Sequence, residues 1–152
     1  MVYLSLGANL GDKQSNIERS IYLINERVGT VRAVSNYFES KPWGYDSPNN
    51  FLNVAVKVET VLMPEELLTV VQEIEQTIGR KHKTINGQYH DRKIDIDILL
   101  YDDQIISSSD LTIPHPRLHH RPFVLLPLSE IAPDFYHPIL KKTIAKIQLQ
   151  DN

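Results

Sequence analysis

The sequence lacks cysteine, long apolar runs and an excess of basic residues, and each absence excludes a class of protein. Without cysteine there is no disulfide, no thiolate nucleophile and no cysteine-ligated zinc site. No apolar run is long enough for a transmembrane helix, and no signal peptide opens the chain. The formal net charge of -3 speaks against general nucleic-acid binding, which needs an extended basic surface. We therefore expect a cytoplasmic protein that binds neither membranes nor nucleic acid.

Two common phosphate-binding motifs are also missing. The chain has no G-x-x-x-x-G-K-S/T loop, and its Gly7-Ala8-Asn9-Leu10-Gly11 segment does not match the G-x-G-x-x-G dinucleotide turn. A bound nucleotide would therefore be held mainly by side chains and a metal ion.

Size and hydrophobic patterning predict one mixed domain. The chain has 152 residues, of which 41% are hydrophobic and 23% charged, and we expect one domain over residues 1–152. Alternation and helical spacing predict the order strand, helix, strand, strand, helix, strand. The six segments are 2–6, 12–29, 30–39, 52–58, 64–79 and 94–100, with Asp12 and Pro64 at the helix starts and Gly29 and Gly79 at the helix ends.

This order is that of a ferredoxin-like βαββαβ sandwich, an α+β fold. Both helices then cover one face of an antiparallel sheet. We expect the active site on the opposite, open face, and C-terminal additions beyond the last strand.

The most informative feature is a pair of aspartates in the last predicted strand. Alternation within residues 94–98 places the carboxylates of Asp95 and Asp97 on one face. Two carboxylates about 6 Å apart repel by roughly 3 kcal/mol at an effective dielectric near 20, so a cation between them would explain the pair. Magnesium with a phosphate ligand fits this description. The alternative is an ordinary wet strand face, against which the apolar Leu99 on the same face argues.

Basic residues precede this pair. Arg80, Lys81 and Lys83 open the preceding loop, and Arg92 and Lys93 close it. Carboxylates for a metal beside cationic groups for phosphate are typical of phosphoryl transfer. The alternative is that the first three merely complement the dipole of the preceding helix, worth under about 1 kcal/mol at the surface. That alternative does not extend to Arg92.

An aromatic ring and an amide are predicted to share the aspartate face. Phe51 and Asn53 stand two residues apart in the third strand, where the ring could stack on a flat ligand and the amide could bond its edge. The alternative is an apolar patch covered by a neighbouring loop. Trp43, in the loop before them, is either a wall of the ligand site or a plug over the core.

The segment 112–123 contains three histidines but does not predict a zinc site. Prolines on both sides of His115 keep it out of a helical His-x-x-x-His pair, and adjacent histidines such as His119 and His120 usually diverge. We expect phosphate or nucleotide contacts instead. The preceding residues 107–110 are predicted to be a short polar loop.

Together these motifs resemble the 6-hydroxymethyl-7,8-dihydropterin pyrophosphokinase family over nearly the whole chain. The resemblance implies transfer of a diphosphate from ATP to a pterin alcohol in folate biosynthesis, with two Mg²⁺ ions. We also expect a monomer whose partners are its small-molecule substrates, ATP and hydroxymethyldihydropterin. The motifs are Ser5-Leu6-Gly7-Ala8-Asn9-Leu10-Gly11, Phe51-Leu52-Asn53, Pro64-Glu65-Glu66-Leu67-Leu68, Arg92-x-x-Asp95-Ile96-Asp97-Ile98-Leu99, and Pro114-His115-Pro116 followed by Arg121-x-Phe123.

The resemblance further implies roles for individual positions. Asp95 and Asp97 would bind both magnesium ions, and Asp97, Arg80 and Arg92 would be catalytic. The implied ATP contacts are Gln72, Glu75, Lys83, Arg92, Ile98, Thr112, His115 and Arg121. The implied pterin contacts are Ser40, Lys41, Trp43, Phe51, Asn53, Tyr89 and Phe123.

The chain departs from the family pattern before the aspartate strand. It has Tyr89-His90-Asp91-Arg92 where the family commonly shows Trp-Gly-Pro-Arg, and His82 where an arginine is frequent. Loop closure and product release, which often limit turnover in lid enzymes, can differ accordingly.

Two functions of other classes stay open from the residues alone. A regulatory module that senses a small ligand would retain Phe51 and Asn53 but would have no use for the arginine-aspartate set. A metal-dependent phosphohydrolase would use the aspartates with water as the acceptor. Analysis of the products distinguishes both from a diphosphate transferase.

Overall fold

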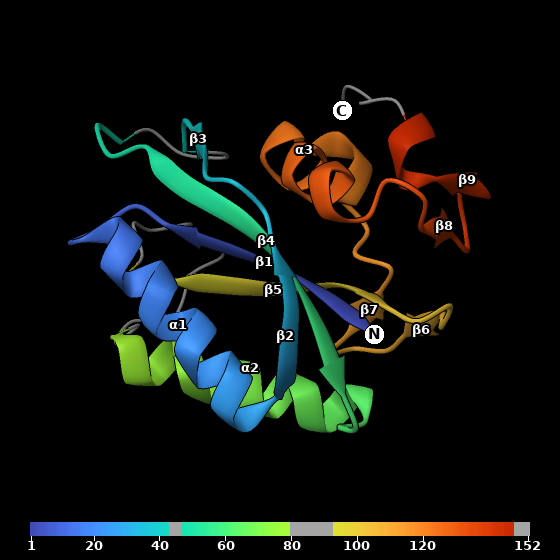
Figure 1. The fold of residues 1–152 in the computed structure, drawn as a ribbon, viewed down its shortest axis with the longest axis horizontal. Coiled ribbons are helices and arrows are strands. Elements are labelled where there is room, and N and C mark those ends of the chain that lie inside the picture. Colours follow the sequence, from blue (N-terminus) through green and yellow to red (C-terminus); the bar gives the residue numbers. More distant parts are fainter. Residues whose placement is uncertain (43–46, 80–92, 148–152) are drawn as a thin grey trace.

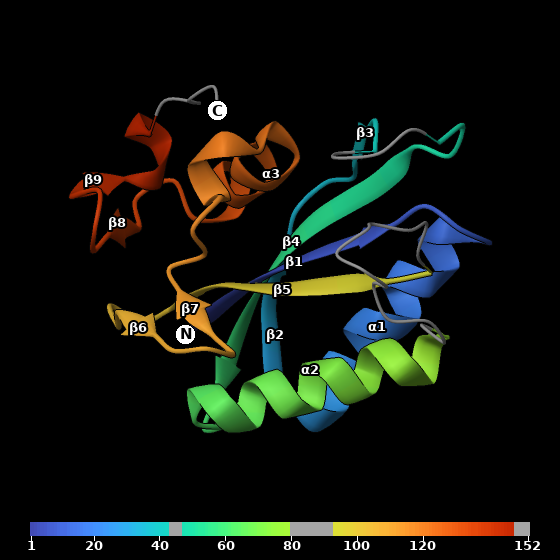
Figure 2. The same ribbon diagram turned by 180° about the vertical axis from the view of Figure 1, so that it is seen from behind.

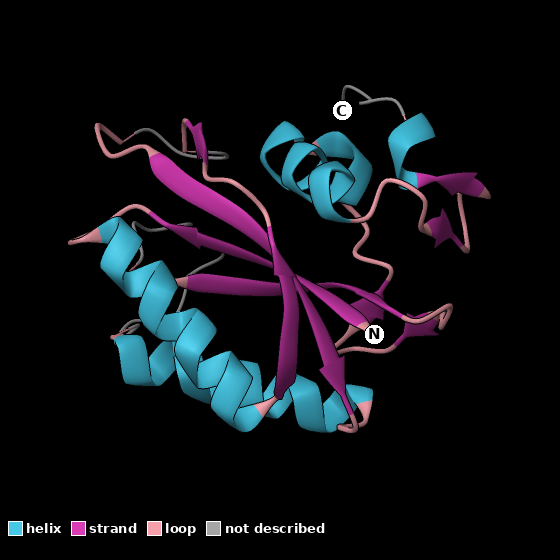
Figure 3. Cartoon of the chain, in the orientation of Figure 1, coloured by secondary structure: helices cyan, strands magenta, loops and turns pink. Residues whose placement is uncertain are grey.

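The computed structural model describes residues 1–42, 47–79 and 93–147, and its centre is one antiparallel sheet. The strands are β1 (Val2–Ala8), β2 (Gly29–Val34), β3 (Phe38–Ser40), β4 (Phe51–Thr60) and β5 (Asp95–Tyr101). They lie in the order β2-β4-β1-β5, and β3 pairs with β4 (Figure 1, Figure 3). The helices of this unit are α1 (Lys13–Arg27) and α2 (Pro64–Ile78). The strand order and the helices confirm the predicted ferredoxin-like sandwich.

The two helices begin at the predicted residues and cover the same face of the sheet (Figure 1, Figure 2). At the start of α1, the backbone N–H of Ser15 donates to Asp12 Oδ1 at 3.1 Å. At the start of α2, the backbone N–H of Met63 donates to Glu66 Oε1 at 3.0 Å. Such bonds satisfy amide groups that a helix end leaves without intrahelical partners.

The two glycines predicted as helix ends serve different purposes. Gly79 takes a φ of +127° directly after α2, which a residue with a Cβ rarely adopts. Gly29 instead starts β2, because α1 already ends at Arg27. A Cβ on Gly29 would lie 2.0 Å from the carbonyl oxygen of Glu59 in β4. The close approach of two strands therefore requires this glycine.

The alternating apolar residues of three strands form the core under α1 and α2, as predicted. Each buried aliphatic side chain stabilises the fold by about 1.5 to 3 kcal/mol. These strand residues, each at most 6% exposed, are Val2, Leu4, Leu6, Val54, Val56, Val58, Ile94, Ile96 and Ile98.

The prediction of a single second strand over 30–39 is wrong. The ladder breaks after Val34 and a new strand starts at Phe38. Between them the N–H of Ser35 still donates to the Ala55 carbonyl at 2.9 Å, and the Ser35 hydroxyl accepts the N–H of Ala55 at 2.9 Å. A side chain thus replaces a backbone carbonyl at the break, so β2 and β3 both stay attached to β4.

The second face of the sheet is only partly open, which corrects the expectation of a fully open face. The helix α3 (Pro122–Ile131) packs over it on the side opposite α1 and α2 (Figure 1). Leu99, on which the ligand interpretation of this face depended, is 0% exposed in that second core. Its apolar character is explained by packing against residues of the C-terminal segment.

A bulge in β5 supplies two leucines to this second core. Tyr3 of β1 pairs with Leu100 and the next residue, Leu4, pairs with Ile98, so Leu99 is extra. An extra residue reverses the alternation beyond it. Leu99 and Leu100 therefore both pack in the second core, while Ile98 packs under the helices.

The predicted C-terminal additions are α3, a short hairpin beside β5 and several short elements near α3 (Figure 2). They are β6 (Ile106–Ser107), β7 (Thr112–Ile113), η1 (Leu118–His120), β8 (Tyr136–His137), β9 (Lys142–Thr143) and η2 (Ile144–Lys146). Among the described helices, none combines the length and apolarity that crossing a bilayer requires.

Candidate active site

Two rows of residues cross the part of the sheet that the described residues leave uncovered. Asn53 and Asp95 both pair with Gly7, from opposite sides of β1, and Asp97 pairs with Ser5 in the next row. Directly paired residues of antiparallel strands point to the same face. The two aspartates and Asn53 therefore share one face, as the sequence predicts, with the Cα atoms of Asn53 and Asp95 about 10 Å apart across two strand spacings.

Gly7 is the floor of the first row. A Cβ at this position would lie 3.0 Å from Asn53 Oδ1 and 3.4 Å from Phe51 Cδ1. Both β4 side chains thus lean over the glycine toward the aspartate strand. Sequence reasoning missed Gly7 because it tested the glycine only as part of a phosphate loop. The available signal was its place two residues after Ser5, on the polar face of β1.

The amide of Asn53 has a fixed orientation. Its Nδ2 donates to the Phe38 carbonyl at 3.0 Å and to Ser40 Oγ at 2.9 Å, and the residue is 3% exposed. Both amide hydrogens are therefore used within β3. Oδ1 remains directed over Gly7 as a hydrogen-bond acceptor, which fits a ligand that offers N–H donors.

Four further residues predicted to contact the pterin belong to the described part of the chain. Ser40 pairs with Phe51, which is half-buried at the start of β4, while Lys41 is exposed. Phe123 is half-buried in the first turn of α3. The predicted Trp43 lies outside the described residues, as do Tyr89, Arg80, Lys83 and Arg92.

Arg121 connects the aspartates with α3. Its Nη1 lies 3.9 Å from Asp97 Oδ2, and the two side chains are 13% and 33% exposed. The same guanidinium lies 5.8 Å from the centroid of the Phe123 ring. A partly buried cation beside the carboxylates gives the site a group that can bind phosphate bidentately.

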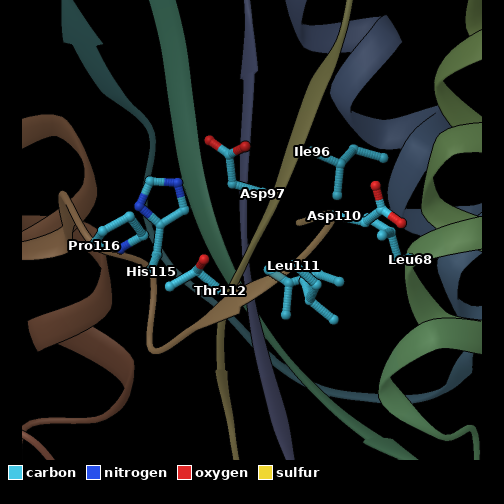
Figure 4. A pocket seen from close by; sticks show the side chains of 9 residues that line it. Leu68, Ile96, Asp97, Asp110, Leu111, Thr112, His115 and Pro116 are labelled. Atoms are coloured by element: carbon cyan, nitrogen blue, oxygen red, sulfur yellow. The ribbon is translucent and has the colours of Figure 1, made fainter. Parts of the chain in front are cut away.

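A cavity of about 270 Å³ opens beside Asp97, between β5, α2 and the β6–β7 hairpin (Figure 4). Three further residues predicted for ATP line it: Ile98, Thr112 and His115. The remaining walls are Leu68, Ile96, Asp110, Leu111 and Pro116. Sequence reasoning missed Asp110, because it treated residues 107–110 as a plain loop and could not place that loop against α2.

His115 is a neutral hydrogen-bonding group. Burial lowers its pKa to about 4, and the positive charge of Arg121 acts in the same direction, whereas Asp95 opposes the shift. Its Nδ1 accepts the N–H of Arg117 at 3.2 Å, so Nε2 carries the proton and can donate. Its backbone N–H donates to the Leu99 carbonyl at 2.9 Å, which ties the histidine to β5.

The two predicted ATP contacts in α2 differ in position. Gln72 is exposed, whereas Glu75 is 5% exposed and its Oε2 accepts the backbone N–H of Ile96 at 2.8 Å. Glu75 therefore contacts the strand between the two aspartates. Its contact with ATP stays a prediction.

The aspartates suit magnesium better than a metal held by protein alone. Within residues 1–42, 47–79 and 93–147, no three His, Asp or Glu side chains come together as a metal cluster. Mg²⁺ commonly takes one or two carboxylates and fills its other positions with substrate phosphates and water. Asp95 and Asp97 supply that number of carboxylates, two residues apart on one face.

Comparison with known proteins gives one consistent answer. Residues 3–133 match the family model of 7,8-dihydro-6-hydroxymethylpterin-pyrophosphokinase (HPPK). The chain is 44% identical over 139 residues to the 2-amino-4-hydroxy-6-hydroxymethyldihydropteridine pyrophosphokinase of Porphyromonas gingivalis, covering 91% of this chain and 94% of that protein. It is 42% identical over 147 residues to the protein of the same name from Aquifex aeolicus, covering 97% and 89%.

Solved structures agree on the fold. A Plasmodium falciparum HPPK-DHPS chain superposes with a TM-score of 0.77 at 18% identity, over 96% of this chain. This chain spans only 42% of that longer one.

Proposed function

Because the chain belongs to the 7,8-dihydro-6-hydroxymethylpterin-pyrophosphokinase family, we propose that the uncovered half of its sheet is where it transfers a diphosphate from ATP to 6-hydroxymethyl-7,8-dihydropterin. This reaction of folate biosynthesis gives AMP and the pterin diphosphate. The main support for placing the reaction there is the strand register, which brings Asp95, Asp97 and Asn53 onto one face of the sheet.

ATP occupies the cavity beside Asp97 in this proposal. β5 is an edge strand, and the N–H of Ile96 points away from β1 to Glu75. Ile98, two residues further, presents its backbone groups at the same edge, where a purine could bond them. The triphosphate then extends toward Asp97 and Arg121, whose guanidinium would balance its charge. Arg80 and Arg92 are proposed to act on the same phosphates.

The pterin binds over Gly7 in this proposal. Asn53 Oδ1 would accept hydrogen bonds from N–H groups at the pterin edge, while Phe51 and Phe123 would stack on its faces. A side chain at Gly7 would occupy the space that the ring needs. Ser40 supports the pocket indirectly, because it accepts one of the Asn53 amide hydrogens.

The chemistry is an in-line exchange at phosphorus. The pterin hydroxyl oxygen bonds to the β-phosphorus, the bond to the oxygen bridging the α and β phosphates breaks, and AMP leaves with that electron pair while the hydroxyl loses its proton. Two Mg²⁺ ions held by Asp95 and Asp97 would neutralise charge on the phosphates. Asp97 would also orient the hydroxyl by accepting its hydrogen bond. Arg121 and α3 limit the access of water from one side.

We further propose that residues 1–152 act as a single domain and a monomer in the cytoplasm. The central sheet with a core on each face supports one domain. The net charge of -3 fits small anionic substrates bound at a local basic site better than nucleic acid.

One product analysis tests the proposed function. The protein is incubated with ATP, Mg²⁺ and 6-hydroxymethyl-7,8-dihydropterin, and the products are identified by mass spectrometry. AMP and the pterin diphosphate in equal amounts are expected, and neither should form when the pterin or Mg²⁺ is omitted. ADP as the sole nucleotide product would contradict diphosphate transfer. Phosphate released without pterin would instead indicate a hydrolase.

A further inference from the structure

The β6–β7 hairpin places an acid at the cavity beside β5. Asp110 lies in the loop between the two strands, and its side chain lines the cavity next to Leu68 of α2 (Figure 4). Within the described part of the chain, its carboxylate has no hydrogen bond and no ion pair. Asp110 is exposed to solvent, so its carboxylate is accessible to a ligand at the rim of the cavity.

The loop that carries Asp110 is held closed. The backbone N–H of Ser108 donates to the Leu111 carbonyl at 3.0 Å, and the N–H of Leu111 donates to Ser108 Oγ at 3.1 Å. These two bonds join Ser108, which precedes Asp110 in the loop, to Leu111, which follows it. The backbone of Asp110 is thus held in a defined turn at the rim of the cavity.

Polar groups stand on two sides of the cavity, with apolar walls between them. Asp97, Thr112 and His115 lie on one side, and Asp110 lies on the other beside Leu68 (Figure 4). Leu111 fills the wall between the two sides.

The charges decide which half of ATP meets Asp110. The phosphates belong beside Asp97, because Arg121 lies there at 3.9 Å. A carboxylate without a cation would repel a phosphate, so Asp110 is unsuited to that half of the ligand. The nucleoside half therefore occupies the side of the cavity that Asp110 borders.

We propose that Asp110 is a specificity-determining residue whose carboxylate accepts a hydrogen bond from the nucleoside half of ATP. An ionised carboxylate only accepts hydrogen bonds, so it favours an amine of the base or a hydroxyl of the ribose and disfavours a carbonyl oxygen. This inference rests on the proposed function, because it requires ATP in this cavity.

The test compares nucleotides rather than total activity. We measure kcat/KM for formation of the pterin diphosphate with each of four nucleotides: ATP, ITP, 2′-deoxy-ATP and 3′-deoxy-ATP. The natural chain is compared with Asp110→Ala and Asp110→Asn. ITP replaces the 6-amino group by a carbonyl, and the deoxy nucleotides each lack one hydroxyl. Asp103→Ala, an exposed aspartate of the β5–β6 connection that does not line the cavity, is the matched control.

We expect the natural chain to prefer ATP over at least one analogue, and Asp110→Ala to reduce that preference about fivefold, as the loss of one partly exposed hydrogen bond predicts. The affected analogue identifies the donor: ITP indicates the base amine, and a deoxy nucleotide indicates a ribose hydroxyl. If the base amine is the donor, Asp110→Asn should raise the use of ITP, since an amide can donate to its carbonyl. Asp103→Ala should leave every ratio unchanged.

Two results would overturn the inference: a natural chain that uses all four nucleotides equally, or an Asp110→Ala variant that is folded and active with its preferences intact. Calorimetric titration of each chain with a non-hydrolysable ATP analogue provides a readout apart from turnover. Failure of the proposed function looks different, because the natural chain would then form no AMP from ATP at all.

Discussion

The carboxylate of Glu75 in α2 bonds the backbone N–H of Ile96, at 2.8 Å, so a helix side chain holds the peptide that lies between Asp95 and Asp97. Among the described strands, β5 is the edge of the sheet and has no neighbour on this side to bond its amides. Glu75 takes the place of such a neighbour. The spacing of the two aspartates therefore depends on α2 as well as on the strand.

Replacing Glu75 by alanine is expected to lower the free energy of unfolding by about 2 kcal/mol, because a buried N–H loses a charged acceptor. Glu75→Gln keeps an acceptor oxygen and should lose less. Urea unfolding followed by circular dichroism measures both. Equal losses in the two variants would show that the bond to Ile96 does not carry the effect.

Asp97→Ala is expected to lower kcat by several orders of magnitude while the fold stays intact. A half-exposed carboxylate adds little to the core, so the free energy of unfolding should change by less than about 1 kcal/mol. Asp134→Ala, at an exposed position after α3, serves as the control. Near-normal turnover in a folded Asp97 variant would contradict the proposed role.

Gly7→Ala is expected to raise KM for the pterin roughly tenfold and to leave KM for ATP nearly unchanged, because small displacements in a positioned site are costly. The added Cβ would stand 3.0 Å from Asn53 Oδ1, so the amide must shift. Steady-state kinetics with each substrate varied in turn measures the split. Thr30→Ala, on the exposed side of the far strand β2, should change neither constant. An equal rise in KM for the pterin and KM for ATP would show that the effect of Gly7→Ala is not confined to the pterin site.

Because of His115, we expect the protein to lose stability in mild acid. Its pKa is about 4 in the fold and near 6.5 in an unfolded chain, so only the unfolded chain takes up a proton between these values. The contribution of the neutral His115 to the free energy of unfolding is complete above pH 6.5 and is lost as the pH falls toward 4. His115→Asn, which offers an oxygen near the place of Nδ1, should therefore lose less stability than the natural chain between pH 7 and 4.5. Urea unfolding at both pH values tests this, and identical losses would exclude the effect.

The sheet and its two helices could be predicted because their signals are local. Alternation in β1, β4 and β5 and the cap at Asp12 depend on neighbouring residues only. α3 gave no comparable signal, because Pro127 interrupts its pattern and its main partner in the sheet, β4, is distant in sequence. The break at Ser35 was hidden for a similar reason, since a side chain replaces the backbone bond there.

The site could be predicted where chemistry and alternation coincide. Asp95, Asp97 and Asn53 reach one face because they follow the two-residue period of their strands. Leu99 was found on the right face for the wrong reason, since residues of the second core and not a ligand bury it. Asp110 could not be placed, because its meeting with α2 follows from how a hairpin folds back across the sheet.

The extra residue at Leu99 gives one surface two different environments. Before it, the strand carries the half-exposed Asp95 and Asp97, and from Leu99 onward its two leucines pack in the second core. The second core is apolar and has a low dielectric constant, and it borders Asp95 and Asp97. The electric field of these two carboxylates is therefore concentrated on the side from which the substrates approach. Deleting Leu99 would leave Leu100 opposite Tyr3 but would remove one buried leucine from the second core, so the apolar wall beside the acidic pair depends on this extra residue.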